Sequence, residues 1–205
     1  MAASVSLISV WEGSYRFSKR AIDLILSVFG LVFLAPLILA IAVFVRLSSS
    51  GPIIFKQDRL GLNGKPFTIY KFSMMREGSH KISLITLHRD ERITWVGKIF
   101  RPFHFDELPQ FWNIIKGDMT LVGPRPDSIG LGKEISEYIP NYLDRLQVMP
   151  GLTGLAQVNR GHDVSKEVIK RSFELDMQYI ANRSLLLDLS ILARTVIVVI
   201  KRNGN

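Results

Sequence analysis

The sequence predicts a single α+β fold that is mostly helical, with a membrane-inserted N-terminal helix and a small β-hairpin. Three observations predict this fold: a long uncharged segment near the N-terminus, two short strand-like runs separated by turn residues, and later segments with apolar residues at helical spacing. We expect residues 1–50 to form the membrane-inserted part. Residues 51–205 should form the remaining domain, integrated with that helix.

Composition favours a protein that works at a membrane. The chain has 205 residues, a net charge of +8 and 47% hydrophobic residues, and its mean hydropathy is +0.20. A basic and apolar chain suits an anionic membrane surface, an anionic substrate, or both. There is no cysteine, which excludes disulfides and thiolate metal sites. The basic residues form no stripe with exposed aromatics, so a nucleic-acid partner is disfavoured.

The uncharged segment Leu24–Val45 is about 22 residues long, enough to cross a bilayer as a helix. It is too long for the apolar region of a signal peptide. Pro36 lies in its middle and should kink it. Basic residues flank it on both sides: Arg16, Lys19 and Arg20 before it, and Arg46, Lys56 and Arg59 after it. A re-entrant helix that enters and leaves by the same leaflet reconciles the kink with these charges. The alternative is a buried helix of a soluble core.

The two strand-like runs are Ile53–Gln57 and Phe67–Phe72, and the turn residues Gly61–Gly64 between them predict a hairpin. A turn at residues 48–52 separates the hairpin from the preceding helix. Lys71, near the end of the second run, is a candidate phosphate-binding cation. An isolated lysine at a strand edge is more often simply solvated.

Helical spacing is clearest after residue 101, where apolar residues recur on one face: Leu108, Phe111, Trp112 and Ile115. We expect Asp106 to be the N-cap of this helix and Lys116-Gly117 to end it. A short strand is expected at Met119–Val122.

The rest of the chain is predicted to be largely helical. One helix should cover much of residues 132–147, with a disturbance at Pro140, and another residues 165–180; residues 150–154 should form a loop. The apolar segment 185–200 contains Asp188 and Arg194. It is expected to be an amphipathic helix lying on the membrane interface, or else a helix packed into the core.

Asp106 and Glu107 are the candidate catalytic pair. At a helix start, backbone amides stabilise negative charge, and an ionised Asp can serve as a nucleophile or a metal ligand. An arbitrary Asp-Glu pair in this position would usually only cap the helix. Arg125 stands between Pro124 and Pro126, which fix its backbone, so its guanidinium suits bidentate phosphate binding. A surface ion pair is the plainer role for Arg125. Arg101 precedes Asp106 by five residues.

Other common phosphate and metal motifs are absent from the sequence. It contains neither a Walker motif nor G-x-G-x-x-G. The four histidines have no metal-site spacing, and we expect them at the surface or supporting the site: His80, His88, His104 and His162.

Several fragments occur together in a specific order and spacing. They are Lys19-Arg20-x-x-Asp23; Gly51-Pro52-x-x-Phe55-x-Gln57-x-Arg59-x-Gly61; Lys71-Phe72; Asp106-Glu107-Leu108-Pro109-Gln110; Asn113; Gly117-Asp118-Met119; Val122-Gly123-Pro124-Arg125-Pro126; the run from Pro150-Gly151-Leu152-Thr153-Gly154 to Asn159; and Asp176. In these fragments the sequence resembles the bacterial sugar transferases, or monotopic phosphoglycosyl transferases. The likeness covers nearly the whole chain from about Phe17, and its size resembles the small members that consist of the catalytic domain alone.

The resemblance implies a Mg²⁺-dependent, two-step reaction on the cytosolic face of the bacterial inner membrane, by a monotopic enzyme. The residue matching Asp106 would attack the β-phosphate of a UDP-sugar and release UMP, and the phosphosugar would then pass to polyprenol (undecaprenyl) phosphate. Glu107 matches the second acid, which binds metal or assists proton transfer. Metal binding is thus expected at Asp106 and Glu107, and phosphate binding at Arg101, Arg125 and Lys71 with Pro124 and Pro126. Membrane lipids are expected partners, and a homodimer is compatible with the sequence.

Three positions depart from the family pattern. Ser73 follows Lys71-Phe72 where Arg is usual, and Met149 stands where a basic residue is common. Asn159-Arg160-Gly161 reverses the usual order, which leaves the substrate-binding role of Arg160 open and suggests an altered sugar preference. Two other functions remain open at this stage. One is a membrane-bound, Mg²⁺-dependent lipid-phosphate phosphodiesterase, and the other is a non-catalytic membrane scaffold.

Overall fold

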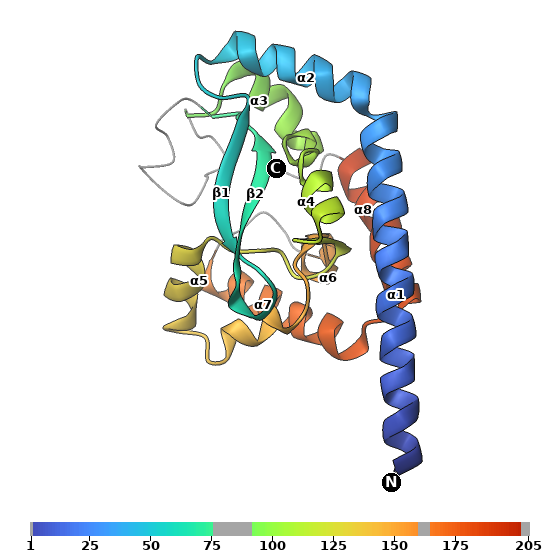
Figure 1. The fold of residues 1–205 in the computed structure, drawn as a ribbon. Coiled ribbons are helices and arrows are strands. Elements are labelled where there is room, and N and C mark those ends of the chain that lie inside the picture. Colours follow the sequence, from blue (N-terminus) through green and yellow to red (C-terminus); the bar gives the residue numbers. More distant parts are fainter. Residues whose placement is uncertain (1, 76–91, 160–164, 202–205) are drawn as a thin grey trace.

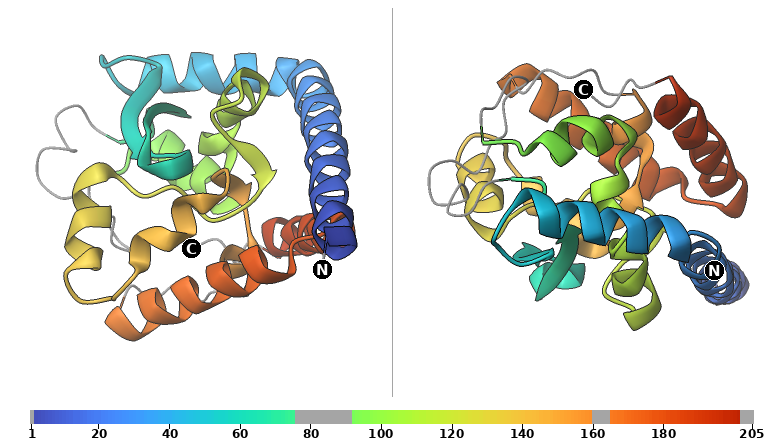
Figure 2. Two further views of the ribbon diagram at one scale, coloured as in Figure 1. Left: turned by 60° about the horizontal axis from the view of Figure 1, so that its bottom comes forward. Right: turned by 90° about the horizontal axis from the view of Figure 1, so that it is seen from above.

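The computed structural model describes residues 2–75, 92–159 and 165–201 and is a mostly helical α+β fold, as predicted (Figure 1). A long helix stands at one side of the molecule. A second helix bends away from its end and lies over the β-hairpin. The remaining helices gather beneath and beside the hairpin, and the last of them runs beside the first (Figures 1 and 2).

The N-terminal segment forms two helices, α1 (Ala2–Phe33) and α2 (Ala35–Ser48), bent by 62° with respect to each other. The prediction of a kink at Pro36 is confirmed, because Pro36 lies in the first turn of α2 and has no amide to continue the hydrogen bonding of α1. Helix α1 begins well before the uncharged segment. In the described ranges no helix is long and apolar enough to cross a bilayer by itself, whereas the bent pair could do so by length and composition.

The predicted hairpin is confirmed and is longer than expected. Strands β1 (Ile54–Leu60) and β2 (Pro66–Phe72) pair antiparallel, joined by the 3₁₀ turn η1 (Leu62–Gly64). Helix α2 packs over one end of the hairpin. There its buried residues Ile41 and Val45 share a core cluster with Phe72 of β2 and with Val96 of α3 (Trp95–Phe100).

The helix expected to start at Asp106 is displaced. Helix α4 spans Gln110–Lys116, and its N-cap is Pro109, which offers no side-chain hydrogen bond. Asp106 instead lies within a 3₁₀ turn, η4 (Phe105–Glu107), so its predicted role as N-cap is wrong. Only Leu108 and Pro109 separate the acidic pair from α4. As predicted, α4 ends at Gly117, which adopts φ +90°.

Strand β3 (Thr120–Val122) was predicted, but its partner was not. Residues 150–154 were expected to form a loop, whereas Gly151–Thr153 forms β4, which pairs in parallel with β3. A side chain on Gly151 would collide with the backbone of Gly123, because the two glycines pack directly against each other. This close contact allows the two short strands to pair.

The C-terminal half is helical, as expected. It contains α5 (Ile129–Ser136), the 3₁₀ helix η5 (Tyr142–Gln147), α6 (Leu155–Asn159), α7 (Lys166–Asn182) and α8 (Leu185–Ile200), and the predicted disturbance near Pro140 falls between α5 and η5. The main core joins α4, β3, α7 and α8 through residues such as Ile114, Met119, Tyr179 and Ile191.

Helix α8 packs into the core through one face, which is the second of the two alternatives expected for it. Asp188 and Ile191 are buried, while its other face exposes large apolar residues: Leu186, Leu189, Val196, Ile197 and Ile200. Exposed apolar residues also line the bent helix pair, among them Val32, Phe33, Leu39 and Leu47, each at least two-thirds exposed. Such an extent of exposed apolar surface is typical of a surface covered by lipid or by another protein.

Candidate active site

Two short 3₁₀ turns bring the acidic pair and an arginine together. Arg101 begins η3 (Arg101–Phe103), and Asp106 and Glu107 end η4. Between the turns, His104 adopts a left-handed conformation with φ 56°, which is uncommon for a residue other than glycine. The charges of Arg101 and His104 both act on the Asp106 carboxyl group. His104 is thus the residue that joins the turn of Arg101 to the turn of the acidic pair.

Glu107 is the centre of an ion cluster. Its Oε1 accepts hydrogen bonds from Lys71 Nζ at 2.7 Å and from Arg125 Nη2 at 2.5 Å, and Arg125 Nη1 reaches Oε2 at 3.4 Å. Lys71 comes from β2 and Arg125 from the loop after β3. The side chain of Glu107 is only 9% exposed, whereas that of Arg125 is 42% exposed. The guanidinium of Arg125 therefore binds Glu107 and remains accessible to a ligand.

The two neighbouring carboxyl groups have opposite pKa shifts. Burial favours the neutral form of Glu107, but the positive charges of Arg125 and Lys71 outweigh burial and hold the pKa of Glu107 well below its usual range. Burial, followed by repulsion from Glu107, raises the pKa of Asp106, while Lys71 and Arg101 oppose this rise. Glu107 is therefore the ionised partner of the cluster. Asp106 is the acid whose charge depends on what binds beside it.

Asp106 and Arg101 both retain unused bonding capacity. In the described parts of the chain, no group donates a hydrogen bond to the Asp106 carboxylate, and Nη1 of Arg101 is buried without a hydrogen-bond partner. A buried guanidinium nitrogen without an acceptor is unfavourable unless an anion completes it. A phosphate group placed between Arg101 and Arg125 would supply the missing acceptors and would lie beside Asp106.

Pro124 and Pro126 lie on either side of Arg125, and both prolines are buried.

Arg59 of β1 lies near Arg125 and was not among the expected site residues. It donates to the Pro126 carbonyl oxygen at 3.1 Å and to Gln57 Oε1 at 2.5 Å. Burial, followed by repulsion from Arg125, lowers the pKa of Arg59 to about 10. Its only sequence signal is its place in the Gln57-x-Arg59 fragment.

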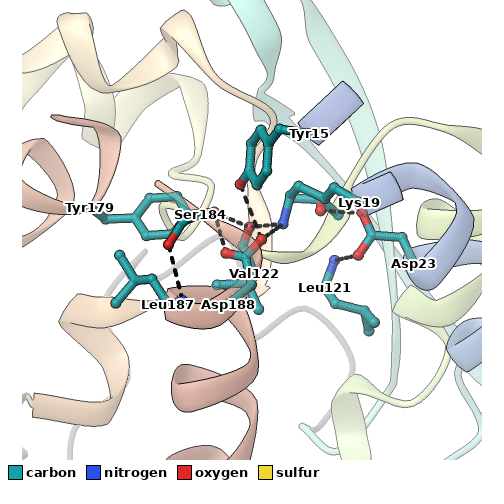
Figure 3. A network of polar contacts seen from close by, with 10 residues as sticks. Tyr15, Lys19, Asp23, Leu121, Val122, Tyr179, Ser184, Leu187 and Asp188 are labelled. Atoms are coloured by element: carbon teal, nitrogen blue, oxygen red, sulfur yellow. Dashed lines mark hydrogen bonds and ion pairs between the residues drawn. The ribbon is translucent and has the colours of Figure 1, made fainter. Parts of the chain in front are cut away.

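The basic fragment near the N-terminus has an internal role that the sequence did not reveal (Figure 3). Lys19 of α1 pairs with Asp188 of α8 at 2.9 Å and donates to the carbonyl of Val122 at 3.0 Å. The hydroxyl groups of Tyr15 and Tyr179 also donate to the Asp188 carboxylate. This buried network fastens α1 and α8 to the end of β3, two residues before the loop that carries Arg125.

The other two charged residues of this fragment also bind the catalytic part of the chain. Arg20 donates to the carbonyls of Ile114 and Ile115 at the end of α4, at 2.6 and 3.0 Å. Asp23 accepts hydrogen bonds from the Thr120 hydroxyl and the Leu121 amide of β3. Helix α1 is therefore attached to α4 and β3, the two elements that lie in the sequence between the acidic pair and Arg125. Of the other predicted residues, Pro36 lies at the remote helix bend and Arg160 lies outside the described residues.

The acidic pair fits Mg²⁺ only together with a ligand. In residues 2–75, 92–159 and 165–201, no group of three or more His, Cys, Asp or Glu residues could hold a metal ion by itself. Proteins usually bind Mg²⁺ through one or two carboxylates, with substrate phosphates and water completing the shell. Asp106 and Glu107 are such a pair, and the Asp106 carboxylate is not occupied by a hydrogen bond from the described residues.

Comparisons with known proteins identify the family of the chain. A family model described as bacterial sugar transferase matches residues 14–202. The chain is 40% identical over 183 residues to a UDP-N-acetylgalactosamine-undecaprenyl-phosphate N-acetylgalactosaminephosphotransferase of Aeromonas hydrophila, covering 89% of the chain and 43% of that protein. It is 38% identical over 188 residues to a UDP-glucose:undecaprenyl-phosphate glucose-1-phosphate transferase of Escherichia coli K12, covering 90% and 40%.

A shorter relative is matched over more of its length. The UDP-glucose:undecaprenyl-phosphate glucose-1-phosphate transferase of Caulobacter vibrioides is 41% identical over 181 residues, which is 87% of the chain and 68% of that protein. The chain spans less than half the length of the Aeromonas and Escherichia relatives. The family-model match, which spans residues 14–202, covers the described site and the helices that hold it.

Proposed function

Because the chain belongs to the bacterial sugar transferase family, we propose that it transfers a sugar phosphate from a UDP-sugar to polyprenol phosphate. The observation that carries this proposal is the arrangement around the acidic pair. Asp106 has no hydrogen bond from the described residues, while three cations surround the pair: Lys71, Arg101 and Arg125. A carboxylate oxygen that accepts no hydrogen bond from the described residues and lies beside a cluster of cations is suited to attack a phosphate that those cations hold.

The reaction proceeds in two displacements at phosphorus. A carboxylate oxygen of Asp106 attacks the phosphorus that bears the sugar, a new P–O bond forms, and the bond to UMP breaks as UMP departs with its electron pair. A phosphate oxygen of the polyprenol phosphate then attacks the same phosphorus and releases the Asp106 carboxylate. The product is polyprenyl-diphosphate-sugar. Splitting the transfer means that the soluble donor and the lipid acceptor need not occupy the site together.

The cations have separate tasks in this reaction. Both terminal nitrogens of Arg125 bind Glu107, and the side chain is 42% exposed, so its remaining N–H groups are available to bind the diphosphate. Arg101 has a buried nitrogen that lacks an acceptor, which suits the oxygens on the phosphorus under attack. Lys71 and Arg125 keep Glu107 ionised, so Glu107 can hold Mg²⁺ with Asp106 when the donor binds. The metal would neutralise charge that develops on the diphosphate.

The lipid acceptor requires the site to lie at a membrane. We propose that α1 and α2 enter one leaflet as a re-entrant pair bent near Pro36 and that the site faces the cytosol, where nucleotide sugars are made. The exposed apolar residues of α1, α2 and α8 support membrane contact. The bend of 62° supports re-entry, since a straight helix over the same residues would exceed the apolar thickness of a bilayer.

The covalent step can be tested by intact-protein mass spectrometry. The purified chain is incubated with a panel of UDP-sugars and Mg²⁺ in the absence of lipid acceptor. We expect a mass gain of one phosphosugar, mapped to Asp106, and release of UMP. Asp106→Asn removes the nucleophilic charge with almost no change of size, so both signals should vanish while the protein stays folded.

A matched control is Asp58→Asn on the exposed side of β1, where the Asp58 carboxylate bonds only to the Thr68 hydroxyl among described residues. This variant should form the adduct as the unmodified chain does. An active enzyme with sequential kinetics and no adduct would leave Asp106 as a metal ligand for direct transfer. Cleavage of lipid phosphate without sugar transfer would support the phosphodiesterase instead.

A further inference from the structure

The loop that carries Arg125 is held through its backbone carbonyls. The carbonyl oxygens of residues 124–127 accept four hydrogen bonds in succession. Their donors are the Gly151 amide at 2.9 Å, Arg145 Nη2 at 2.7 Å, Arg59 Nη1 at 3.1 Å and the Leu60 amide at 2.9 Å. These donors come from β4, η5 and β1, which are far apart in sequence. Each carbonyl is therefore fixed by a different group.

Arg145 is the donor that acts on Arg125 itself. Its side chain is only 6% exposed and lies in a buried ion network with Asp127 and Asp176. Nη2 binds both the Arg125 carbonyl and the Asp176 carboxylate, and Nη1 binds Asp127 and the Tyr142 hydroxyl. Two carboxylates thus fix the guanidinium in one orientation, and that orientation places Nη2 on the Arg125 carbonyl.

We propose that Arg145 is a positioning residue, which aims the guanidinium of Arg125 at the donor diphosphate by holding the Arg125 carbonyl. The inference rests on the proposed function, because it assigns Arg125 to the diphosphate. Arg145 does not touch Glu107 or the open side of Arg125 in the structure; it acts through one backbone hydrogen bond. Pro124 limits φ at its own position, and Pro126 disfavours the helical range of ψ for Arg125, but both leave a range of extended conformations open. The bond from Arg145 to the Arg125 carbonyl constrains that remaining rotation.

A double-mutant cycle separates positioning from general structural support. Arg145→Lys keeps a positive charge near Asp127 and Asp176 but loses the planar fork that reaches both carboxylates and the carbonyl. We expect kcat/KM for the UDP-sugar to fall by about tenfold or more, as for loss of a charge-assisted hydrogen bond. If Arg145 acts through Arg125, Arg145→Lys should cause almost no further loss in the Arg125→Ala background. If the falls in kcat/KM of the two single variants multiply in the double variant, the proposal is wrong. It is also wrong if folded Arg145→Lys has unchanged kcat/KM.

Asp188→Asn is the matched structural control. Asp188 is also buried and bound to a cation and two tyrosines, but its network does not include the Arg125 loop. Any fall in kcat/KM caused by Asp188→Asn should multiply with the fall caused by Arg125→Ala. If Arg145→Lys does not fold, Asp176→Asn loosens the same guanidinium more gently. Asp176→Asn should lower kcat/KM by a smaller factor, and this fall must disappear in the Arg125→Ala background. If the fall persists there, the proposal fails.

Hydrogen exchange tests the positioning when no donor is turned over. The amides of Leu60 and Gly151 bind carbonyls of the loop, whereas the Ser73 amide binds the Ile53 carbonyl at the other end of the hairpin. In Arg145→Lys, exchange at Leu60 and Gly151 should speed up at least several-fold relative to Ser73. Unchanged exchange would refute the inference. Failure of the unmodified chain to release UMP from any UDP-sugar would count against the proposed function alone.

Discussion

At the scale of single residues, the site depends on one buried carboxylate that binds two cations. Glu107 accepts from Lys71 and from both terminal nitrogens of Arg125, and these contacts outweigh the cost of burying its charge. The same contacts hold Lys71 and Arg125 beside Asp106 before any substrate arrives. Preorganised donors of this kind need little rearrangement when charge develops on a phosphate.

Arg125→Lys tests whether the geometry of the guanidinium matters as well as its charge. Lysine keeps the positive charge but cannot offer two parallel donors, so one charge-assisted contact should be lost. The expected cost is roughly 1.5–3 kcal/mol, or about ten- to a hundredfold in kcat/KM for the donor. Steady-state kinetics of UMP release measure this directly. The control is Arg171→Lys, because Arg171 is 70% exposed and, among the residues that the structure describes, pairs only with Glu174 on the same helix. Near-normal kinetics of folded Arg125→Lys would remove Arg125 from the binding site.

The acidic pair, Lys71 and Arg125 could be predicted because the fragments that contain them are short and distinctive. The structure brings these four residues together. Arg145 and Arg59 were not predicted as contributors to the site, for a physical reason. Their acceptors include backbone carbonyls at residues 125 and 126, and a carbonyl leaves no trace in the residue types of a sequence. Likewise, Lys19 and Arg20 were interpreted as membrane-flanking charges, whereas their contacts lie inside the fold.

At the scale of elements, two glycines set how closely β3 and β4 approach. Residues 150–154 were interpreted as a loop because Pro and Gly usually interrupt regular structure. In this fold the lack of a side chain is what allows the strand to form, since Gly151 lies against the backbone of Gly123. Sequence spacing therefore located this segment but could not predict its pairing. The β3–β4 contact also positions the loop that begins at Gly123.

Gly151→Ala should therefore be severely destabilising. Its methyl group would overlap the backbone of Gly123, which cannot move as a flexible side chain could. Overpacking of this kind costs roughly 3 kcal/mol, which corresponds to a fall in Tm of about 6–12 °C for a chain of this length. Gly13→Ala is the control, because a methyl group there meets nothing within 4 Å. Its Tm should equal or slightly exceed that of the unmodified chain. A normal Tm for Gly151→Ala would show that β3 and β4 are farther apart than described.

At the scale of the whole molecule, both halves of the bent helix pair are fastened to the same body. Residues Tyr15 to Asp23 of α1 bind β3, α4 and α8, and the buried face of α2 packs against the hairpin and α3. The pair projects apolar side chains outward both at the bend, as with Phe33 and Leu39, and farther along α2, as with Leu47. The kink could be predicted from the sequence. The groups that anchor the two flanks could not, because they depend on tertiary contacts that no local pattern encodes.

This anchoring makes a definite prediction about topology. If α1 crossed the bilayer and α2 emerged on the far side, the contacts that tie the two flanks to one domain would have to break. Moreover, α2 has 14 residues and is only about 21 Å long, shorter than the apolar core of a bilayer, which is about 30 Å. Both flanks should therefore lie on the cytosolic side. The chain has no native cysteine, so Ser14→Cys and Ser50→Cys, both at exposed positions, provide single probes on either flank.

In intact spheroplasts, an impermeant thiol reagent should label neither cysteine, and after lysis it should label both. Pro36→Leu restores an amide at the bend, and so should favour a straighter helix and shift some molecules to a spanning form. The straight form over residues 13–48 would be about 54 Å long at 1.5 Å per residue, and would have to expose one flank to the periplasm. We therefore expect labelling of one cysteine from outside only in the Pro36→Leu background. Labelling of either cysteine in intact cells that retain Pro36 would show a true span, and the re-entrant arrangement would then be wrong.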